Sequence, residues 1–425
     1  MTAPAPAGGP AREPAGGVFR SFRFRNYRTW FLGALVSNIG TWMQRTAQSW
    51  LVFDGLTDHD ASAIGVVTAL QFLPQLLLAP WAGVLADRLD RRRLLLCTQT
   101  AMAALAAALG ALVLSGAVTL ELVYVFALAL GVATTVDAPV RQTFVSELVD
   151  DEHLSNAVAL NSTSFNSARL IGPAVAGVLV AAVGTGWVFL LNTVTFGAML
   201  AAILVIRGKE LRPMPRSGRG RGQIREGLAY VAGRPDIVAV LVAVFLLGTF
   251  GMNFAVFLAA MAGPEFGRGS EVFGALNSVL ALGTVAGALL SARRRRARLR
   301  YVFGGSAAFG LACLGAATAP TLPLFALWLV PCGLASLTIM TTANAYVQST
   351  TSPVMRGRVM SLYMAIFMGG TPLGAPLVGW LTDALGPRWG MGAAVAAGAG
   401  GAAVGLIFLL RLRSGRTAAG PGATA

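Results

Sequence analysis

Twelve long apolar segments dominate this sequence of 425 residues. Each is close to the length of about 20 residues that a helix needs to cross about 30 Å of hydrocarbon. Lipid offers the backbone no hydrogen-bond partners, so such segments must form helices or a closed barrel. Their many glycines and prolines and their lack of strand-like alternation favour helices. The segments are 28–53, 62–86, 94–117, 121–140, 155–183, 187–206, 237–262, 271–292, 301–319, 322–350, 358–382 and 389–410.

The composition supports the same class. Hydrophobic residues make up 55% of the chain and charged residues only 12%, whereas about a quarter of the residues in a soluble domain are charged. We therefore predict an all-α membrane protein with twelve transmembrane helices, in contact with the lipid bilayer.

Basic residues gather on one predicted side of the membrane. If odd-numbered spans run outward, all but four of the 33 Lys and Arg residues fall on the inner side. Arg268 and Arg388 fall outside, and Arg45 and Arg169 lie within spans. The positive-inside rule then predicts cytoplasmic termini and a multi-pass protein of the cytoplasmic (inner) membrane. Because topology accounts for the net charge of +15, nucleic-acid binding loses its main support.

An internal repeat divides the spans into two groups of six. Gly172, Gly177, Gly184 and Trp187 recur 202 positions later as Gly374, Gly379, Gly386 and Trp389. Two such halves form a known transporter architecture with a site near the midplane. The predicted parts are a disordered or interfacial N-terminus (1–27), a first half (28–206), a basic cytoplasmic linker (207–236), a second half (237–410) and a cytoplasmic tail (411–425). A short amphipathic helix is expected in the linker, from Gln223 to Gly233.

The loop after the second span carries a specific motif. Residues 83–93 read GVLADRLDRRR, which closely resembles the signature loop between helices two and three of the major facilitator superfamily. In such a loop a glycine lets helices approach, Asp87 can pair with a neighbouring basic group, and the arginines hold the loop inside. The second half keeps Gly287 but has Ser291 in place of Asp87, so we expect a latch of this type mainly in the first half.

A second motif narrows the resemblance. Residues 137–142 read DAPVRQ, residues 147–149 read ELV and residues 156–161 read NAVALN. Together with GTWMQR at 40–45, they resemble the enterobactin-exporter and macrolide-efflux branch, the third family of drug:proton antiporters. This resemblance implies export of a siderophore, drug or related metabolite. Gly172, Pro173 and Gly177 match the antiporter motif of drug exporters only in part, which leaves proton antiport open.

Polar side chains share a face on two of the predicted helices. A charged side chain at mid-membrane costs about 2.5 to 3.5 kcal/mol on insertion scales, so Arg45 and Arg169 need partners or water. We interpret these faces as the lining of a central cavity that binds substrate, with helix-to-helix bonding as the alternative. The predicted substrate-binding residues are Asn38, Thr41, Gln44, Arg45, Gln48, Asn166 and Arg169.

Acidic residues are missing from the depth of the predicted spans and occur only at their ends. A buried arginine stays protonated, so it cannot carry a coupling proton. We hypothesise a net-positive cavity that favours an anionic substrate, such as a carboxylate or catecholate. An inside-negative potential would then favour its export by about 2.3 kcal/mol per charge and 100 mV. If protons are coupled, Asp54 and Asp137 are the candidate carboxylates.

An inner gate is predicted where the second and fourth spans reach the cytoplasmic side. Asp137 and Arg141 stand four residues apart, one helical turn, and Arg141 could also reach Asp87. Their ion pair would hold the outward-facing state of the transporter and break as the halves rock; a static surface pair is the alternative. The predicted gating residues are Gly83, Asp87, Arg88, Arg91, Asp137 and Arg141.

Other classes of protein lack a basis in the sequence. His59 and His153 have no ligand-like neighbours, so no metal or other cofactor is expected. The sequence has neither a GxxxxGK[ST] phosphate loop nor a nucleophile elbow, which argues against ATP-driven transport and against an enzyme. We predict a secondary transporter, active as a monomer, that exports a small amphipathic metabolite by alternating access. A proton-coupled multidrug antiporter and a non-transporting receptor or scaffold remain the alternatives.

Overall fold

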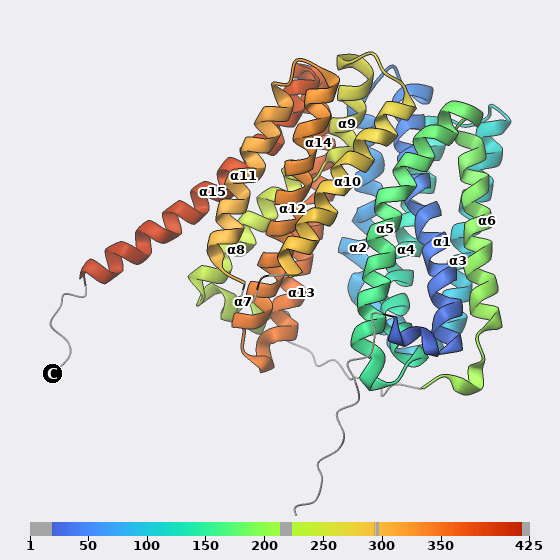
Figure 1. Ribbon diagram of the computed structural model, residues 1–425, viewed down its shortest axis with the longest axis horizontal. Helices are drawn as coiled ribbons and strands as arrows, with labels where there is room; N and C mark the ends of the chain where they lie inside the picture. Colours follow the sequence, from blue (N-terminus) through green and yellow to red (C-terminus); the bar gives the residue numbers. More distant parts are fainter. Residues whose placement is uncertain (1–18, 213–222, 293, 295–296, 419–425) are drawn as a thin grey trace, which may run out of the picture.

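The computed structural model describes residues 19–212, 223–292, 294 and 297–418, and within them all regular structure is helical. Two groups of helices stand side by side (Figure 1). The first group contains α1 (Arg25–Trp50), continued by η2 (Leu51–Leu56), and α2 (Ala61–Arg88), α3 (Arg91–Leu114), α4 (Leu120–Leu148), α5 (Asp151–Val183) and α6 (Thr185–Val205). A short helix, η1 (Arg20–Arg23), precedes it.

The second group has the same number of membrane passes in more pieces. One broken pass consists of α8 (Pro235–Leu246), η4 (Leu247–Gly251), α9 (Phe254–Ala260) and η5 (Met261–Glu265), and another of α13 (Pro353–Gly369) and α14 (Thr371–Leu385). The others are α10 (Ser270–Ala292), α11 (Leu299–Ala317), α12 (Leu322–Thr350) and α15 (Pro387–Ala418). Between the groups lie η3 (Gly208–Glu210) and α7 (Gln223–Ala232). The all-helical prediction is confirmed, and so is the helix in the linker.

Eleven helical segments in the described part are long and apolar enough to cross a membrane. The remaining predicted span is α1, whose 26 residues pack along α5 and α6. Its polar side chains, Arg45 among them, lower its hydropathy below that of the others. The weakest membrane signal in the chain therefore belongs to the helix that carries most of the predicted site.

Two predicted continuous spans are broken in the structure. The segment 237–262 is interrupted at Met252 and Asn253, which leave helical geometry, directly after Gly251. The segment 358–382 is divided at Gly370, with Pro372 in the first turn of α14; proline lacks the N–H that a continuous helix would need. The last helix, α15, continues beyond the predicted span into the predicted tail, to Ala418.

The repeated glycines serve the same purposes in both groups. Gly184 and Gly386 end α5 and α14 with φ of 84° and 99°, a region that glycine enters without strain. A side chain on Gly172 would meet Ile39 and Trp42 of the first membrane pass, and one on Gly374 would collide with Thr249 of the seventh. The repeat thus marks close helix crossings at equivalent places.

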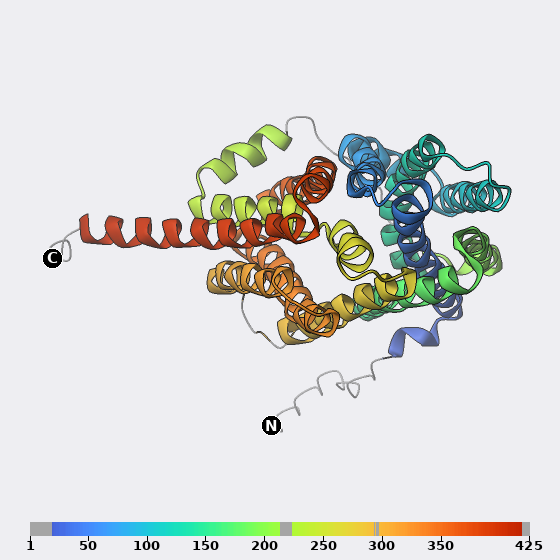
Figure 2. The same cartoon turned by 90° about the horizontal axis from the view of Figure 1, so that it is seen from above.

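The two groups meet mainly toward the face opposite the termini. There α2 packs on α14 and α5 packs on α10. A side chain on Gly379 would lie 2.5 Å from the Ala61 carbonyl oxygen, and one on Gly177 would lie 2.8 Å from that of Ser270. Toward the termini the two groups diverge (Figure 1), and Figure 2 shows from above the two bundles side by side and in contact. The structure is therefore closed at the face opposite the termini, which we call the far face.

Glycine packing inside the second group yields a stability prediction. A methyl group on Gly283 of α10 would collide with the Val330 carbonyl oxygen of α12, whereas one on Gly304 of α11 would meet nothing within 4 Å. We expect Gly283→Ala to cost about 1 to 3 kcal/mol, as overpacking does, and to lower the midpoint of thermal unfolding in detergent. Gly304→Ala is the matched control and should leave that midpoint unchanged or raise it, since alanine favours a helix. Equal midpoints for the two variants would contradict this packing.

Candidate functional site

Some polar residues on the polar face of α1 form hydrogen bonds to neighbouring helices, and the others do not. Gln44 and Gln48 are buried. Gln44 accepts a hydrogen bond from Asn192 of α6, and Gln48 accepts one of 3.3 Å from Gln71 of α2. These two predicted substrate ligands therefore already hold α1 to its neighbours. Thr41 donates to its own helix, at the Ser37 carbonyl (2.8 Å), and Asn38 is half-buried.

Arg45 and Arg169 converge on one indole ring. The guanidinium carbon of Arg45 lies 5.3 Å from the ring centre of Trp42, one turn earlier on α1, and 5.5 Å from that of Phe72 on α2. The guanidinium carbon of Arg169, on α5, lies 5.4 Å from the Trp42 ring. Three helices thus bring two cations against one aromatic side chain, where cation–π attraction offsets part of their desolvation.

Arg45 and Arg169 have no carboxylate partner in the part of the chain that the structure describes. Among the side chains that the structure describes, none with an acidic group lies within ion-pair distance of either arginine. The Arg45 Nε is buried and has no hydrogen-bond partner. An unpaired buried charge is costly, so the arrangement favours the binding of an anion or of water. The cluster of Arg45, Trp42, Phe72 and Arg169 is hereafter the arginine–tryptophan cluster.

The cluster lies beside the seam between the two groups. Leu170, the residue after Arg169, accepts a hydrogen bond of 3.1 Å from Ser278 of α10. Phe165, on α5, packs edge-on against Trp42 at 5.7 Å and is 48% exposed. Asn166, half-buried, donates to the Ser162 carbonyl on its own helix (2.8 Å). A rearrangement of the seam would therefore act directly on the side chains around Arg169.

Sequence reasoning selected the arginines and missed the aromatic residues that hold them. Trp42 precedes Arg45 by three positions, a spacing at which helical side chains are neighbours. That spacing was a usable signal, because an arginine within a span needs a partner and the indole face is one of the few available. Phe72 and Phe165 carried no such signal, since their contacts are set by helix packing.

The predicted gate residue Asp137 is buried and accepts three hydrogen bonds. Its Oδ1 accepts from Thr98 and Gln99 of α3, both at 2.8 Å, and its Oδ2 accepts from Arg141 Nε at 2.9 Å. Arg141 Nη1 is buried without a partner. The pairing of Asp137 with Arg141 is as the sequence predicted. Its surroundings join α3 to α4 within the first group.

A second ion pair joins the ends of the same helices. Arg91, in the first turn of α3, pairs with Glu147 in the last turn of α4, and these side chains are only 12% and 13% exposed. Sequence reasoning placed Arg91 at the gate but did not identify Glu147 as its partner. Arg88 is exposed at the end of α2, and Gly83 lies within α2. The side chain of Asp87 lies outside the described part, so its predicted contact with Arg141 stays a prediction.

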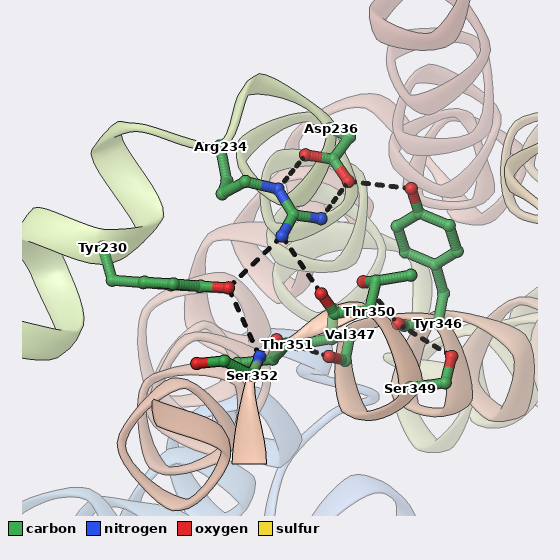
Figure 3. A network of polar contacts seen from close by, with 9 residues as sticks. All are labelled: Tyr230, Arg234, Asp236, Tyr346, Val347, Ser349, Thr350, Thr351 and Ser352. Carbon is green, nitrogen blue, oxygen red and sulfur yellow. Dashed lines mark hydrogen bonds and ion pairs between the residues drawn. The ribbon is translucent and has the colours of Figure 1, made fainter. Parts of the chain in front are cut away.

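The termini side of the second group has its own charged network, which the sequence analysis missed. Arg234 pairs with Asp236 through two bonds of 2.9 and 2.7 Å, and Tyr346 of α12 donates to the same carboxylate at 2.8 Å (Figure 3). Arg234 also donates to Tyr230 of α7 (3.3 Å) and to the Thr350 carbonyl (3.0 Å). These bonds tie α7 to the start of α8 and the end of α12, and the hydrogen bonds to Asp236 are the main cause that raises the pKa of Arg234.

The two carboxylates considered for proton coupling lie far apart along the first group. Asp137 is in the part of α4 toward the termini, whereas Asp54 is in η2 at the far face. The Asp54 side chain is 47% exposed and lies 3.4 Å from His59 Nε2. It borders a cavity of about 400 Å³ at the far face, together with Arg268 and Glu271. The carboxylates of Asp54 and Asp137 therefore cannot exchange a proton directly.

These features define a class: a membrane transporter of two helical bundles, with a polar site in the first bundle beside the seam between them. The chain belongs to the transmembrane secretion effector family of the major facilitator superfamily, which it matches over residues 17–420. It is a multi-pass transporter of the cytoplasmic membrane, with a small-molecule substrate. The members of the family and the similar structures are transporters rather than enzymes.

Two curated relatives show the range of the family. The staphyloferrin A transporter of Staphylococcus aureus is 26% identical over 363 residues, which cover 84% of this chain and 89% of that protein. The multidrug efflux pump Tap of Mycolicibacterium fortuitum is 28% identical over 375 residues, covering 83% and 88%.

Solved structures support the fold. A mutant form of the nucleoside transporter NupG superposes with a TM-score of 0.72 at 13% identity, covering 91% of this chain and 99% of that one. A D-xylose–proton symporter gives 0.68 at 13% identity, covering 92% and 97%. At these identities the likeness is one of fold alone.

The Asp137–Arg141 pair yields a test of buried charge. Removing one partner of a buried pair costs about 3 to 5 kcal/mol, because the other charge stays buried. We expect Asp137→Ala to lower the thermal midpoint in detergent strongly. The double variant Asp137→Ala/Arg141→Met should be destabilised less than the sum of the single variants, with a coupling of about 1 to 3 kcal/mol.

The exposed pair Arg207–Glu210, with side chains 54% and 46% exposed, is the matched control. A double-mutant cycle on it should give a coupling below about 1 kcal/mol. Additive effects at Asp137 and Arg141 would show that their contact has no energetic weight.

Proposed function

We propose that this transporter exports a small anionic metabolite by alternating access, with Arg45 and Arg169 as the groups that bind its negative charge. The observation that carries the proposal is the absence of any described carboxylate partner for two arginines that share the Trp42 ring. An incoming carboxylate or catecholate would supply that partner. Arginine suits this role because its planar fork binds a carboxylate through two hydrogen bonds.

Aromatic side chains add an apolar surface to the same place. Trp42 lies against both guanidinium groups, Phe72 lies against that of Arg45, and Phe165 packs on Trp42. A substrate with both an apolar part and an anionic group therefore fits best. The relatives, a staphyloferrin A transporter and a multidrug efflux pump, agree with an amphipathic metabolite, siderophore or drug.

The orientation supports export, because the structure is open on the side from which an exporter takes up its substrate. The positive-inside rule favours cytoplasmic termini, and the structure diverges toward the termini side. The site would then receive substrate from the cytoplasm and release it when the far face opens. One chain supplies both bundles and all residues of the arginine–tryptophan cluster, which favours a functional monomer.

A proton-coupled multidrug antiporter is the second candidate. It is favoured by the buried carboxylate of Asp137, held by Thr98, Gln99 and Arg141, and by the similarity to Tap. In that case a pH gradient alone would drive flux in inside-out vesicles, and Asp137→Asn would abolish this drive. For the anion exporter, uptake should follow the membrane potential when the pH gradient is removed.

The proposed site is tested by binding and transport. A panel that pairs each hydroxycarboxylate or catecholate with its neutral ester or ether is first assayed for binding to the purified wild-type protein. We expect only anionic members to bind, and Arg45→Gln and Arg169→Gln each to weaken binding at least tenfold, since a charge-assisted hydrogen bond contributes about 1.5 to 3 kcal/mol.

Uptake of the bound compound into inside-out vesicles should fall in parallel. Arg300→Gln, at an exposed position on α11, is the matched control and should transport as the wild type does. Transport that ignores both cluster variants would contradict the proposed site, and preferential binding of the neutral partners would contradict the anionic substrate class.

A further inference from the structure

The start of α2 is capped by a carboxylate from the other half of the molecule. Asp383, near the end of α14, accepts hydrogen bonds of 2.8 Å from the backbone N–H groups of Ala61 and Ser62, and a third from the Ser62 hydroxyl. The first N–H groups of a helix have no partner within the helix, and its positive end favours an anion. Asp383 therefore completes a helix of the opposite half, more than 300 residues away in sequence.

This cap lies in the seam that closes the far face. One turn before it on α14, a side chain on Gly379 would lie 2.6 Å from the Cα of Ser62, and farther along the seam Gly65 packs directly against the backbone of Ala375. Because α2 and α14 cross so closely, the far face cannot open along this seam without breaking the bonds of Asp383. The bonds of Asp383 therefore belong to the closed arrangement that this structure shows.

The second seam lacks such a cap. The repeat offset of 202 positions pairs Asp383 with Ala181 on α5, so the equivalent place opposite α10 carries no carboxylate. The described polar bond there is the one from Ser278 to the Leu170 carbonyl, at 3.1 Å. At the far face, a carboxylate therefore joins the two halves at the α2–α14 seam and not at the equivalent α5–α10 seam.

A second carboxylate stands at the same helix end. Asp60 is the N-cap residue of α2 and accepts a hydrogen bond of 3.0 Å from the N–H of Ala63. Burial is the main cause that raises the pKa of Asp60 above its ordinary value, and the nearby Asp383 raises it further. The hydrogen bond from the N–H of Ala63 lowers the pKa of Asp60 but does not cancel this increase. Two carboxylates that meet at one site repel each other unless one of them binds a proton.

Among the described groups around Asp60, the one that can carry a positive charge is His59, and its contacts are with other carboxylates. On α4, Tyr124 and Glu121 face this region, and α9, which packs on both α2 and α14, contains no titratable side chain. On its own segment, the His59 ring lies beside Asp54 at 3.4 Å and Asp58 at 3.7 Å. Asp383 is therefore the group whose arrival alters the surroundings of Asp60.

We propose that Asp383 latches the far face shut by capping α2 of the opposite half, and that Asp60 makes this latch depend on the pH at that face. Opening removes Asp383 and exposes Asp60 to water. The closed state therefore binds a proton more tightly than the open state, and by linkage acid favours closure. The effect develops as the pH falls through the raised value in the closed state and is complete below the ordinary value near 3.9. The proton is bound and released at the same face, so the latch regulates access and does not itself drive transport.

The latch can be tested without a substrate by measuring distances across the far face. Ala117, in the loop between α3 and α4, and Thr321, at the start of α12, are exposed positions on opposite halves. They are changed to cysteine in a background in which Cys97, Cys313 and Cys332 are replaced. Spin labels at both positions report the open and closed populations by double electron–electron resonance in nanodiscs, at about pH 5 and about pH 8.

For the wild type we expect a shift toward the shorter distance at the lower pH, with about a tenfold change in the closed-to-open ratio for each pH unit by which the pKa of Asp60 in the closed state exceeds the lower pH of the comparison. Asp60→Asn keeps a good N-cap and should show the short distance at both pH values. Asp383→Ala should show the long distance at both, and Asp383→Asn, which keeps one acceptor, an intermediate population. Glu121→Gln, an acidic position in the first turn of α4, should respond as the wild type does.

A wild-type distance distribution in Asp383→Ala would overturn the latch. An unchanged pH response in Asp60→Asn would overturn the proposed role of Asp60 in the pH dependence, while the capping of α2 by Asp383 would still stand. The proposal rests on alternating access and not on the identity of the substrate. Because no substrate is added, these results are independent of whether the arginine–tryptophan cluster binds an anion.

Discussion

The free-energy cost of an unpaired charge away from water determines how the arginines of this protein are placed and paired. Its partly buried arginines show two solutions. Arg91, Arg141, Arg234 and Arg388 each pair with a carboxylate, and those contacts lie toward the ends of the bundles. Arg45 and Arg169, which lie within predicted spans, have the face of Trp42 instead. The two arginines deep in the first group thus lack the carboxylate partner that these four have, and a transported anion is the simplest candidate for that partner.

The absence of water also determines how the helices of the two halves pack against each other. In hydrocarbon, helices gain little from burying apolar side chains, so close backbone contact at small residues holds them together. The repeated glycines place such contacts at equivalent positions: Gly177 faces α10 and Gly379 faces α2. At the α2–α14 seam, Asp383 adds charge-assisted, directional hydrogen bonds to the start of α2. These bonds make the closure of the far face differ between its two seams, and we propose that they regulate its opening.

Much of this architecture could be predicted from the sequence, because bilayer thickness and backbone hydrogen bonding leave few choices. The helical class, the repeat and the helix from Gln223 in the linker followed from local patterns, and so did the pairing of Asp137 with Arg141 one turn later. Contacts between distant segments did not. The bonds from Asn192 to Gln44, from Arg91 to Glu147 and from Ala61 to Asp383 join residues far apart in the chain. Asp383 was visible only as an acidic residue at the end of a span. The breaks near Asn253 and Gly370 were equally hidden, since hydropathy reports a span and not its continuity.

The central claim is that the transported species carries negative charge to a site made by Arg45 and Arg169. The most direct measurement is the transient current that follows a jump in substrate concentration over proteoliposomes on a solid-supported membrane, at equal pH on both sides. The account predicts a current whose sign corresponds to negative charge moving with the substrate, and its loss when both arginines are replaced by glutamine. A current of the opposite sign, or electroneutral transport that survives those replacements, would contradict it.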